Sequence, residues 1–141
     1  MLRGLDPLLT PELLHALASA GHGDRVVIAD ANFPAAATAR RLVRAPGVAA
    51  TAMLEAVLSV LPVDDFEPDP VAVMQVVGDP SATPEAVRDF TSILQRHGLA
   101  APARLGRHDF YRSAAEAFVI VQTGERRLYG NVLLTKGVVH P

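Results

Sequence analysis

The sequence predicts a single α/β domain, built from a mixed β-sheet with flanking helices. Two segments that are apolar at all but one position each, 25–29 and 71–77, are too short for amphipathic helices and indicate interior strands. The tripeptide Thr-Pro-Glu begins a helical pattern twice, at Thr10 and at Thr83. A polar turn over 123–127 separates two further apolar segments and predicts that the last two strands run antiparallel.

Length and composition limit the classes of protein to which the chain can belong. With 141 residues and no linker-like change of composition, we expect one domain over residues 1–141. The net charge is −2 and the basic residues are scattered, so we expect no nucleic-acid partner. The absence of cysteine excludes a disulfide framework and a thiol nucleophile, and it fits a reducing compartment. No signal-peptide core or apolar run of ~20 residues is present, so we expect a cytoplasmic protein without membrane contact.

Helical and strand patterns alternate along the first part of the chain. Thr10 is expected to cap a helix that Gly21 ends, and the strand 25–29 follows. A short helical piece is then expected over 35–37, with a possible strand over 41–44.

The middle of the chain contains a helix, an acidic loop and a strand. Thr51 is expected to cap a helix that continues to Leu61, where Pro62 stops it. The segment 63–70 combines acidic residues with prolines and predicts a solvated loop before the strand 71–77.

The last part of the chain begins with the second Thr-Pro-Glu signal. We expect a helix from Thr83 to about His97, and a short strand over 104–105. Asp109 is expected to cap the helix after it.

The two final apolar segments, 118–121 and 128–134, are expected to pair as a hairpin. Tyr129, Gly130 and Asn131 would then lie inside the second strand. A glycine in a strand often marks the close approach of a ligand or another backbone, and otherwise a bulge or a sheet edge.

Two polar residues flank the strand 25–29 and are the first site candidates. His22 lies between two glycines, which leave an imidazole unshielded, although a position near a helix C-terminus also favours histidine. Asp30 follows the strand, where α/β proteins bind ligands, although it could simply cap the next turn. About five extended residues at ~3.3 Å each separate the two by roughly 15 to 20 Å. Either a backbone turn or a neighbouring subunit would have to bring them together.

Most familiar catalytic motifs are absent. The sequence has no Gly-x-Gly-x-x-Gly turn, phosphate-binding loop, Gly-x-Ser-x-Gly elbow or His-Glu-x-x-His pair. The five histidines show no short-range pairing, so we expect neither a metal nor a cofactor. Arg107 is a further site candidate, although it could simply be an ordinary surface arginine. The polar candidates that remain are His22, Asp30, Arg107, Tyr129 and Asn131.

Five blocks of sequence carry a resemblance to a known family. They are Gly21-His22-Gly23-Asp24, Asp30-Ala31-Asn32-Phe33-Pro34, Thr123-Gly124-Glu125-Arg126, Tyr129-Gly130-Asn131 and Lys136-Gly137-Val138. With these blocks and their spacing, nearly the whole chain resembles the L-fucose mutarotase and D-ribose pyranase family. Phe33, Arg107 and Gly130 resemble the fucose branch more closely. Asn32 stands where family members can have histidine.

The resemblance implies a site and an assembly. His22 would be the proton donor, and the monosaccharide site would be lined by Asp30, Arg107, Tyr129, Gly130 and Asn131. The resemblance also implies a ring-shaped homo-oligomer, commonly a decamer of two pentamers, with sites at subunit boundaries.

The function expected from this resemblance is L-fucose mutarotase, an isomerase that interconverts the α and β anomers of L-fucose or a related monosaccharide. The residue types fit, because an imidazole can give and take protons at neutral pH and the reaction needs no redox cofactor or metal. The alternatives are D-ribose pyranase, which interconverts pyranose and furanose forms, and a non-catalytic monosaccharide-binding protein.

Overall fold

The computed structural model describes residues 1–141, which form five helices and a six-stranded sheet. The elements in chain order are α1 (Pro11–Ser19), β1 (Arg25–Ala29), α2 (Ala35–Thr38), β2 (Leu42–Ala45), α3 (Ala50–Leu58), β3 (Val71–Met74), α4 (Glu85–Arg96), β4 (Ala103–Leu105), α5 (Arg107–Glu116), β5 (Val119–Thr123) and β6 (Val132–Thr135). The predicted single α/β domain with a mixed sheet is confirmed.

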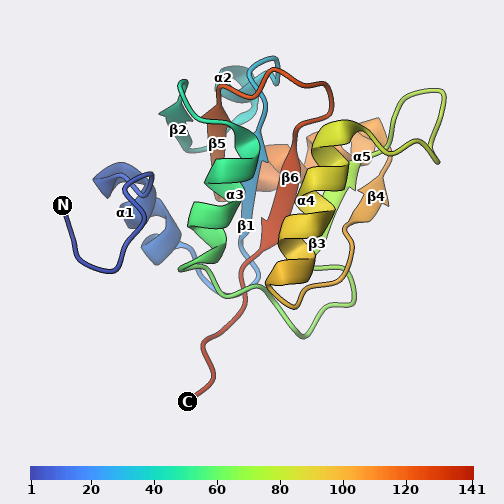
Figure 1. Ribbon diagram of the computed structural model, residues 1–141. Coiled ribbons are helices and arrows are strands. Elements are labelled where there is room, and N and C mark those ends of the chain that lie inside the picture. Colours follow the sequence, from blue (N-terminus) through green and yellow to red (C-terminus); the bar gives the residue numbers. More distant parts are fainter.

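The strands lie in the order β2-β5-β1-β6-β3-β4 (Figure 1). Strand β6 is antiparallel to both of its neighbours, β1 and β3, whereas the other pairs in the sheet are parallel. Strand β1 is central: Val27 lies opposite Ile120 of β5 on one side and opposite Leu133 of β6 on the other. The carboxyl ends of five strands and the amino end of β6 therefore share one edge of the sheet.

Helices cover both faces of the sheet, with α1, α3 and α4 on one face and α2 and α5 on the other (Figure 1). Val26 and Ile28 of β1 belong to the larger core under the first group of helices. Val27 and Ala29 belong to the smaller core under α2 and α5, which also contains Phe110. Because both faces are buried, the interior strands are mainly apolar, as the sequence indicated.

The predicted helix caps divide into one that is confirmed and three that are wrong. Thr10 caps α1, because its hydroxyl oxygen accepts the Leu13 N–H at 3.2 Å and proline fills the first helical position. Thr83 does not cap α4, which has Pro84 at that position and no side-chain cap. Thr51 and Asp109 lie inside α3 and α5, so the prediction that they cap these helices was wrong.

The predicted hairpin between the last two strands is also wrong. Strands β5 and β6 do not pair, because β1 lies between them and hydrogen-bonds to both. Strand β6 begins only at Val132, so Tyr129, Gly130 and Asn131 lie in the loop before it rather than inside a strand. The β3 strand is likewise shorter than predicted and ends at Met74.

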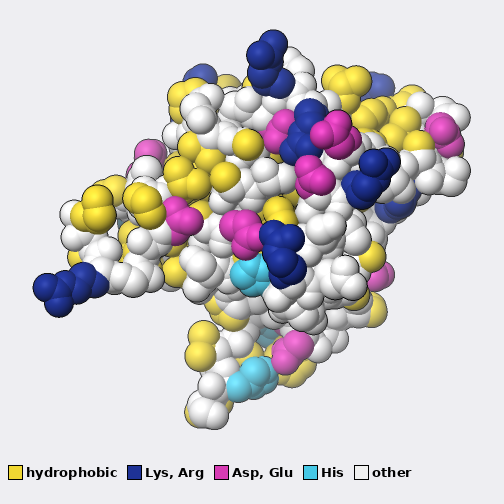
Figure 2. All heavy atoms as spheres, in the orientation of Figure 1, with side chains coloured by type: hydrophobic (Ala, Val, Ile, Leu, Met, Phe, Trp, Pro, Cys, Tyr) yellow, Lys and Arg dark blue, Asp and Glu magenta, His cyan; other side chains and the backbone are white.

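The surface shows no large region of one charge on the face that carries α3 and α4. Basic and acidic side chains stand next to one another there, interspersed with apolar ones (Figure 2). None of the five helices combines the length and apolar character needed to cross a membrane.

Candidate functional site

A cavity of about 310 Å³ opens where the parallel strands end, and four of the predicted site residues line it: Asp30, Arg107, Tyr129 and Asn131. The other lining residues are Asn32, Phe33, Met74, Val77, Tyr111 and Leu128. The cavity is therefore a mixed surface with one carboxylate, one guanidinium, two phenol groups, two amides and several apolar side chains.

Sheet topology explains why these residues meet. Asp30 directly follows β1, Met74 ends β3, and Arg107 begins α5 soon after β4. The three strands point the same way, so their carboxyl ends share an edge, which is where α/β sheets commonly bind ligands. The antiparallel β6 begins at that edge, and the loop before it supplies Tyr129 and Asn131.

Asp30 and Asn131 hold each other through two hydrogen bonds. The Asp30 backbone N–H donates to Asn131 Oδ1 at 2.8 Å, and Asn131 Nδ2 donates to Asp30 Oδ2 at 3.0 Å. Asp30 Oδ1 also accepts the Asn32 N–H at 3.0 Å. Burial raises the pKa of Asp30 above its ordinary value, and these hydrogen bonds offset only part of the effect. The site thus contains a buried carboxylate whose lone pairs are only partly used.

Tyr129 has an unusual backbone conformation. Its φ is 59°, in the left-handed region that residues with a side chain rarely adopt. Its hydroxyl oxygen accepts the Val77 N–H at 3.0 Å, which ties the loop after β3 to the loop before β6. Its hydroxyl proton remains available to a ligand in the cavity.

Gly130 is surrounded so closely that any side chain there would displace its neighbours. A Cβ atom there would lie 2.7 Å from Glu125 Cγ and 3.1 Å from the Arg127 carbonyl oxygen. The glycine therefore marks the close approach of neighbouring protein atoms, one of the explanations that the sequence left open.

Aromatic rings form the apolar wall of the cavity. The Phe33 ring stacks on the Tyr111 ring, with centroids 5.3 Å apart and planes 10° apart. Its edge meets Phe110 in the core at 6.2 Å. Phe33 is itself buried, so Tyr111 and Phe33 present a fixed apolar surface opposite the polar groups.

His22 does not belong to this cavity within one chain. It precedes β1 and therefore lies at the opposite edge of the sheet from Asp30. Its Nε2 lies 2.9 Å from Asp64 Oδ1, and its side chain is 48 % exposed. The Phe66 ring lies 5.3 Å from the imidazole, in a tilted arrangement. Helix α1 ends at Ser19 with an extended cap residue, so a helix cap is not the role of His22.

Asp64 is a site candidate that the sequence did not single out. The acidic segment 63–70 was predicted to be a solvated loop, but Asp64 is buried. Burial acts to raise the pKa of Asp64, but hydrogen bonds from His22 and from the Glu67 and Phe66 backbone hold it below its ordinary value. A carboxylate immediately after the apolar run 61–63 is the one signal that could have indicated it.

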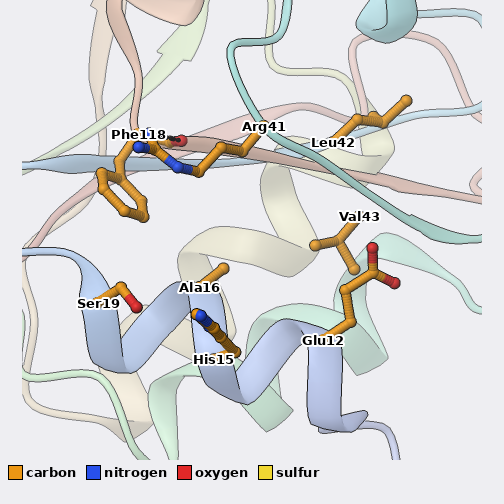
Figure 3. Close-up of a pocket in the computed structure, with 8 residues that line it drawn as sticks. All are labelled: Glu12, His15, Ala16, Ser19, Arg41, Leu42, Val43 and Phe118. Atoms are coloured by element: carbon orange, nitrogen blue, oxygen red, sulfur yellow. Dashed lines mark hydrogen bonds between the residues drawn. The ribbon is translucent and has the colours of Figure 1, made fainter.

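A second cavity, of about 280 Å³, lies between α1 and the edge strand β2 (Figure 3). Arg41 is stacked on the Phe118 ring there at 3.9 Å and donates to the Phe118 carbonyl oxygen. His15 and Ser19 of α1 lie across the cavity from this pair, and the Glu12 side chain points towards Val43. None of the predicted site residues lines this cavity.

Known proteins similar to this chain share its full length. Residues 3–139 match the family described as the RbsD / FucU transport protein family. The fucose mutarotase of Homo sapiens is 44% identical over 147 residues, covering 98% of this chain and 94% of that protein, and the fucose mutarotase of Bos taurus is 43% identical over 149 residues, covering 100% and 96%. The crystal structure of the fucose mutarotase from Streptococcus pneumoniae in complex with L-fucose has a TM-score of 0.93 and 35% identity, covering 99% of this chain and 100% of that chain. The chain belongs to the RbsD / FucU family.

Proposed function

We propose that this chain is a monosaccharide mutarotase, a single domain over residues 1–141 that interconverts the α and β anomers of L-fucose or a closely related sugar. The observation that carries the proposal is the cavity at the carboxyl ends of β1, β3 and β4, in a chain similar to fucose mutarotases over its full length. At about 310 Å³ the cavity is near the lower end of the ~300–1,000 Å³ common for small-molecule sites, which suits one monosaccharide.

The reaction requires only proton transfers and rotation. The ring oxygen gains a proton while the anomeric hydroxyl loses one, the bond between C1 and the ring oxygen breaks, and an open-chain aldehyde forms. Rotation about C1–C2 and the reverse steps give the other anomer. Because the reaction proceeds slowly without help, lowering its barrier by a few kcal/mol is sufficient, at ~1.4 kcal/mol per tenfold in rate.

The cavity residues suit the binding of a sugar. Asp30 offers carboxylate lone pairs to sugar hydroxyls, and Arg107 offers N–H donors at fixed angles. The Tyr129 hydroxyl can donate a further hydrogen bond, and Asn131 holds Asp30 in place. The stacked rings of Phe33 and Tyr111 suit the apolar face or the methyl group of a deoxy sugar.

His22 is the general acid and base of the proposal, and Asp64 orients it. With Nε2 bound to Asp64, the Nδ1 atom is the ring nitrogen that has no partner in the chain. An imidazole held by a carboxylate on one nitrogen and free on the other can transfer protons at the free nitrogen.

We further propose that His22 serves the cavity of a neighbouring copy of the chain. Within one chain the imidazole and Asp30 lie at opposite edges of the sheet, and His22 is absent from the residues that line the cavity. A homo-oligomer, with a decamer of two pentamers as its expected form, would place the two halves together at subunit boundaries. A cytoplasmic location completes the proposal, and the lack of cysteine is consistent with it.

The proposal is tested by NMR saturation transfer between the anomeric protons of L-fucose at equilibrium, using the wild type and His22→Ala and repeating the measurement with D-ribose. We expect exchange above the buffer rate for L-fucose that His22→Ala removes. Faster exchange between the pyranose and furanose forms of D-ribose would favour the pyranase alternative. Binding of L-fucose without enhanced exchange, in the folded and assembled wild type, would favour a non-catalytic binding protein.

A further inference from the structure

Glu125 is a buried carboxylate that the proposed chemistry does not use. Only 5 % of the residue is exposed, and its side chain accepts four hydrogen bonds. Oε1 accepts the Arg127 backbone N–H and the Arg127 Nε–H, both at 3.0 Å. Oε2 accepts from Arg127 Nη2 at 3.2 Å and from the backbone N–H of Ala50, the first residue of α3, at 3.3 Å. Glu125 is therefore fully paired, mainly with a residue two positions along its own loop.

Arg127 extends this connection to α4. Its Nη1 lies 2.6 Å from Asp89 Oδ2 and 3.3 Å from Glu85 Oε1. The hydrogen bond from Arg127 lowers the pKa of Glu125, and the same bond raises the pKa of Arg127, so both groups stay charged at neutral pH. The loop that leads to Tyr129 is consequently fixed to the N-terminal ends of two helices.

Glu125 also touches both segments that form the polar side of the cavity. Its carbonyl oxygen accepts the Ala31 N–H at 2.9 Å, immediately after Asp30. Its Cγ atom borders Gly130, at the spot where a Cβ would come within 2.7 Å. Neither Glu125 nor Arg127 lines the cavity itself, so neither would contact a bound sugar.

Tyr129 has a backbone conformation that its neighbours in the loop have to hold in place. A left-handed backbone at a residue with a side chain is unfavourable and persists only when the surrounding structure holds it in place. Tyr129 lies between the fixed Arg127 and Asn131, whose side chain is bonded to Asp30.

We propose that Glu125 and Arg127 are positioning residues that hold the loop 127–131 in the conformation that binds the sugar. This inference rests on the proposed binding role of the cavity. Without the ion pair, Tyr129 would relax to an ordinary conformation in part of the molecules, and its hydroxyl and the Asn131 amide would leave the cavity wall. Apparent affinity falls in proportion to the fraction of molecules that remain competent to bind.

The test compares two substitutions in the pair with one elsewhere. Arg127→Gln removes the guanidinium, and Arg127→Lys keeps the charge but cannot form the paired Nε and Nη2 bonds. Arg96→Gln is the matched control, because Arg96 also joins α4 to a carboxylate, Glu55 of α3, but its ion pair involves no residue of the loop 127–131. The dissociation constant of L-fucose is measured by calorimetry, and the exchange rate at saturating sugar by NMR.

If the loop is competent in about one tenth of the Arg127→Gln molecules, the dissociation constant rises roughly tenfold while the rate at saturation stays within about twofold of the wild type. The dissociation constant of Arg127→Lys should lie between those of the wild type and Arg127→Gln. The dissociation constant of Arg96→Gln should match that of the wild type. An unchanged dissociation constant in folded Arg127→Gln would overturn the proposal. So would a rate that falls at saturation while affinity is unchanged, because a positioning effect on binding cannot produce that pattern.

Two further variants separate this proposal from the binding role of the cavity. Tyr129→Phe and Asn131→Ala remove groups that belong to the cavity itself. If these two bind L-fucose normally, the cavity is not the sugar site and the proposed function of these residues fails. If they bind weakly and both Arg127 variants bind normally, only the positioning role is wrong. If Arg127→Gln does not fold, the milder Arg127→Lys supplies the same comparison.

Discussion

His22 and Asp30 flank strand β1 and lie at opposite edges of the sheet, and each is completed by a residue that is distant in the sequence. His22 Nε2 lies 2.9 Å from Asp64 Oδ1, whereas Asp30 exchanges two hydrogen bonds with Asn131. The chain therefore presents the proposed proton-transfer group at one edge and the proposed sugar-binding cavity at the other. This separation is the reason for proposing that the site is shared between copies of the chain.

Replacing Asp64 by Asn should slow anomer exchange more than it weakens sugar binding. Since the amide cannot stabilise a protonated His22, we expect the exchange rate at saturating L-fucose to fall at least about tenfold, the scale of a weakened general acid. Asp65→Asn is the control, because Asp65 bonds to His140 on the surface at 2.9 Å. Equal loss in both variants, or full activity of Asp64→Asn, would contradict the role given to Asp64.

Acidification should weaken sugar binding at a higher pH than an ordinary aspartate would suggest. Burial raises the pKa of Asp30 above its ordinary value of 3.8, so this carboxyl group gains its proton earlier as the pH falls. The protonated form loses lone pairs for sugar hydroxyls, and the dissociation constant of L-fucose should therefore rise through this range. Calorimetric titrations of the wild type and Asp30→Asn check this, since the variant should lack that part of the pH dependence.

Protonation of Asp30 should weaken sugar binding but increase the stability of the folded chain. Because the pKa of Asp30 is higher in the folded than in the unfolded chain, the folded state binds the proton more tightly. The free energy of unfolding of the wild type relative to Asp30→Asn should therefore increase as the pH falls from the raised pKa towards 3.8. Urea unfolding at several pH values measures this difference, and a decrease over that range would show that burial does not raise this pKa.

Adding one methyl group at Gly130 should destabilise the protein. The new Cβ would lie 2.7 Å from Glu125 Cγ and 3.1 Å from the Arg127 carbonyl oxygen. Overpacking of this kind costs about 1–3 kcal/mol in the free energy of unfolding. Gly47→Ala is the control, because a Cβ there meets nothing within 4 Å and should change stability by less than about 0.5 kcal/mol. Both are measured by urea unfolding at one protein concentration, and equal stability of the two variants would contradict the prediction.

The two Thr-Pro-Glu sequences should respond differently to loss of the threonine hydroxyl. Thr10→Ala removes the cap of α1 and should cost about 1 kcal/mol of stability. Thr83→Ala removes only an exposed hydrogen bond from Arg104 and should cost less than about 0.5 kcal/mol. Thermal unfolding of both variants makes the comparison, and a larger loss for Thr83→Ala would reverse the assignment of the caps.

Interior strands were the part of the fold that the sequence predicted best. Strand β1 is buried on both faces, so every residue from Val26 to Ala29 is apolar. The local sequence is therefore sufficient to predict this strand. The capping residues of the helices were predicted less reliably. In the first Thr-Pro-Glu sequence the Thr10 hydroxyl caps α1, whereas in the second the Thr83 hydroxyl accepts a hydrogen bond from Arg104. Arg104 lies 21 residues further along the chain, so the residues around Thr83 do not predict this contact.

Strand pairing could not be predicted from local turn signals. The polar segment 123–127 resembles a hairpin turn, but β1 inserts between β5 and β6 because it can pair with both at once. The same segment is polar for another reason, since the buried Glu125 forms an ion pair with the partly exposed Arg127. A local pattern cannot distinguish these two causes.

The candidate site was predicted in part. The carboxyl end of β1 and the resemblance of the blocks led to the residues that line the cavity, including Asp30 and Asn131. Asp64 was missed because its burial depends on pairing between residues far apart in the chain: its backbone N–H donates to the Thr135 carbonyl oxygen at 2.9 Å. Such long-range contacts leave no periodic signal in the sequence.

The central claim, that one chain's His22 serves another chain's cavity, is tested by mixing two inactive variants. His22→Ala and Arg107→Ala are co-expressed with different tags, and the mixed oligomers are purified through both tags. A shared site predicts that roughly a quarter of the sites in a random mixture of equal parts combine an intact His22 with an intact cavity, so anomer exchange of L-fucose returns. Exchange no faster than in the two variants assembled separately would contradict the claim and place both residues in the site of one chain.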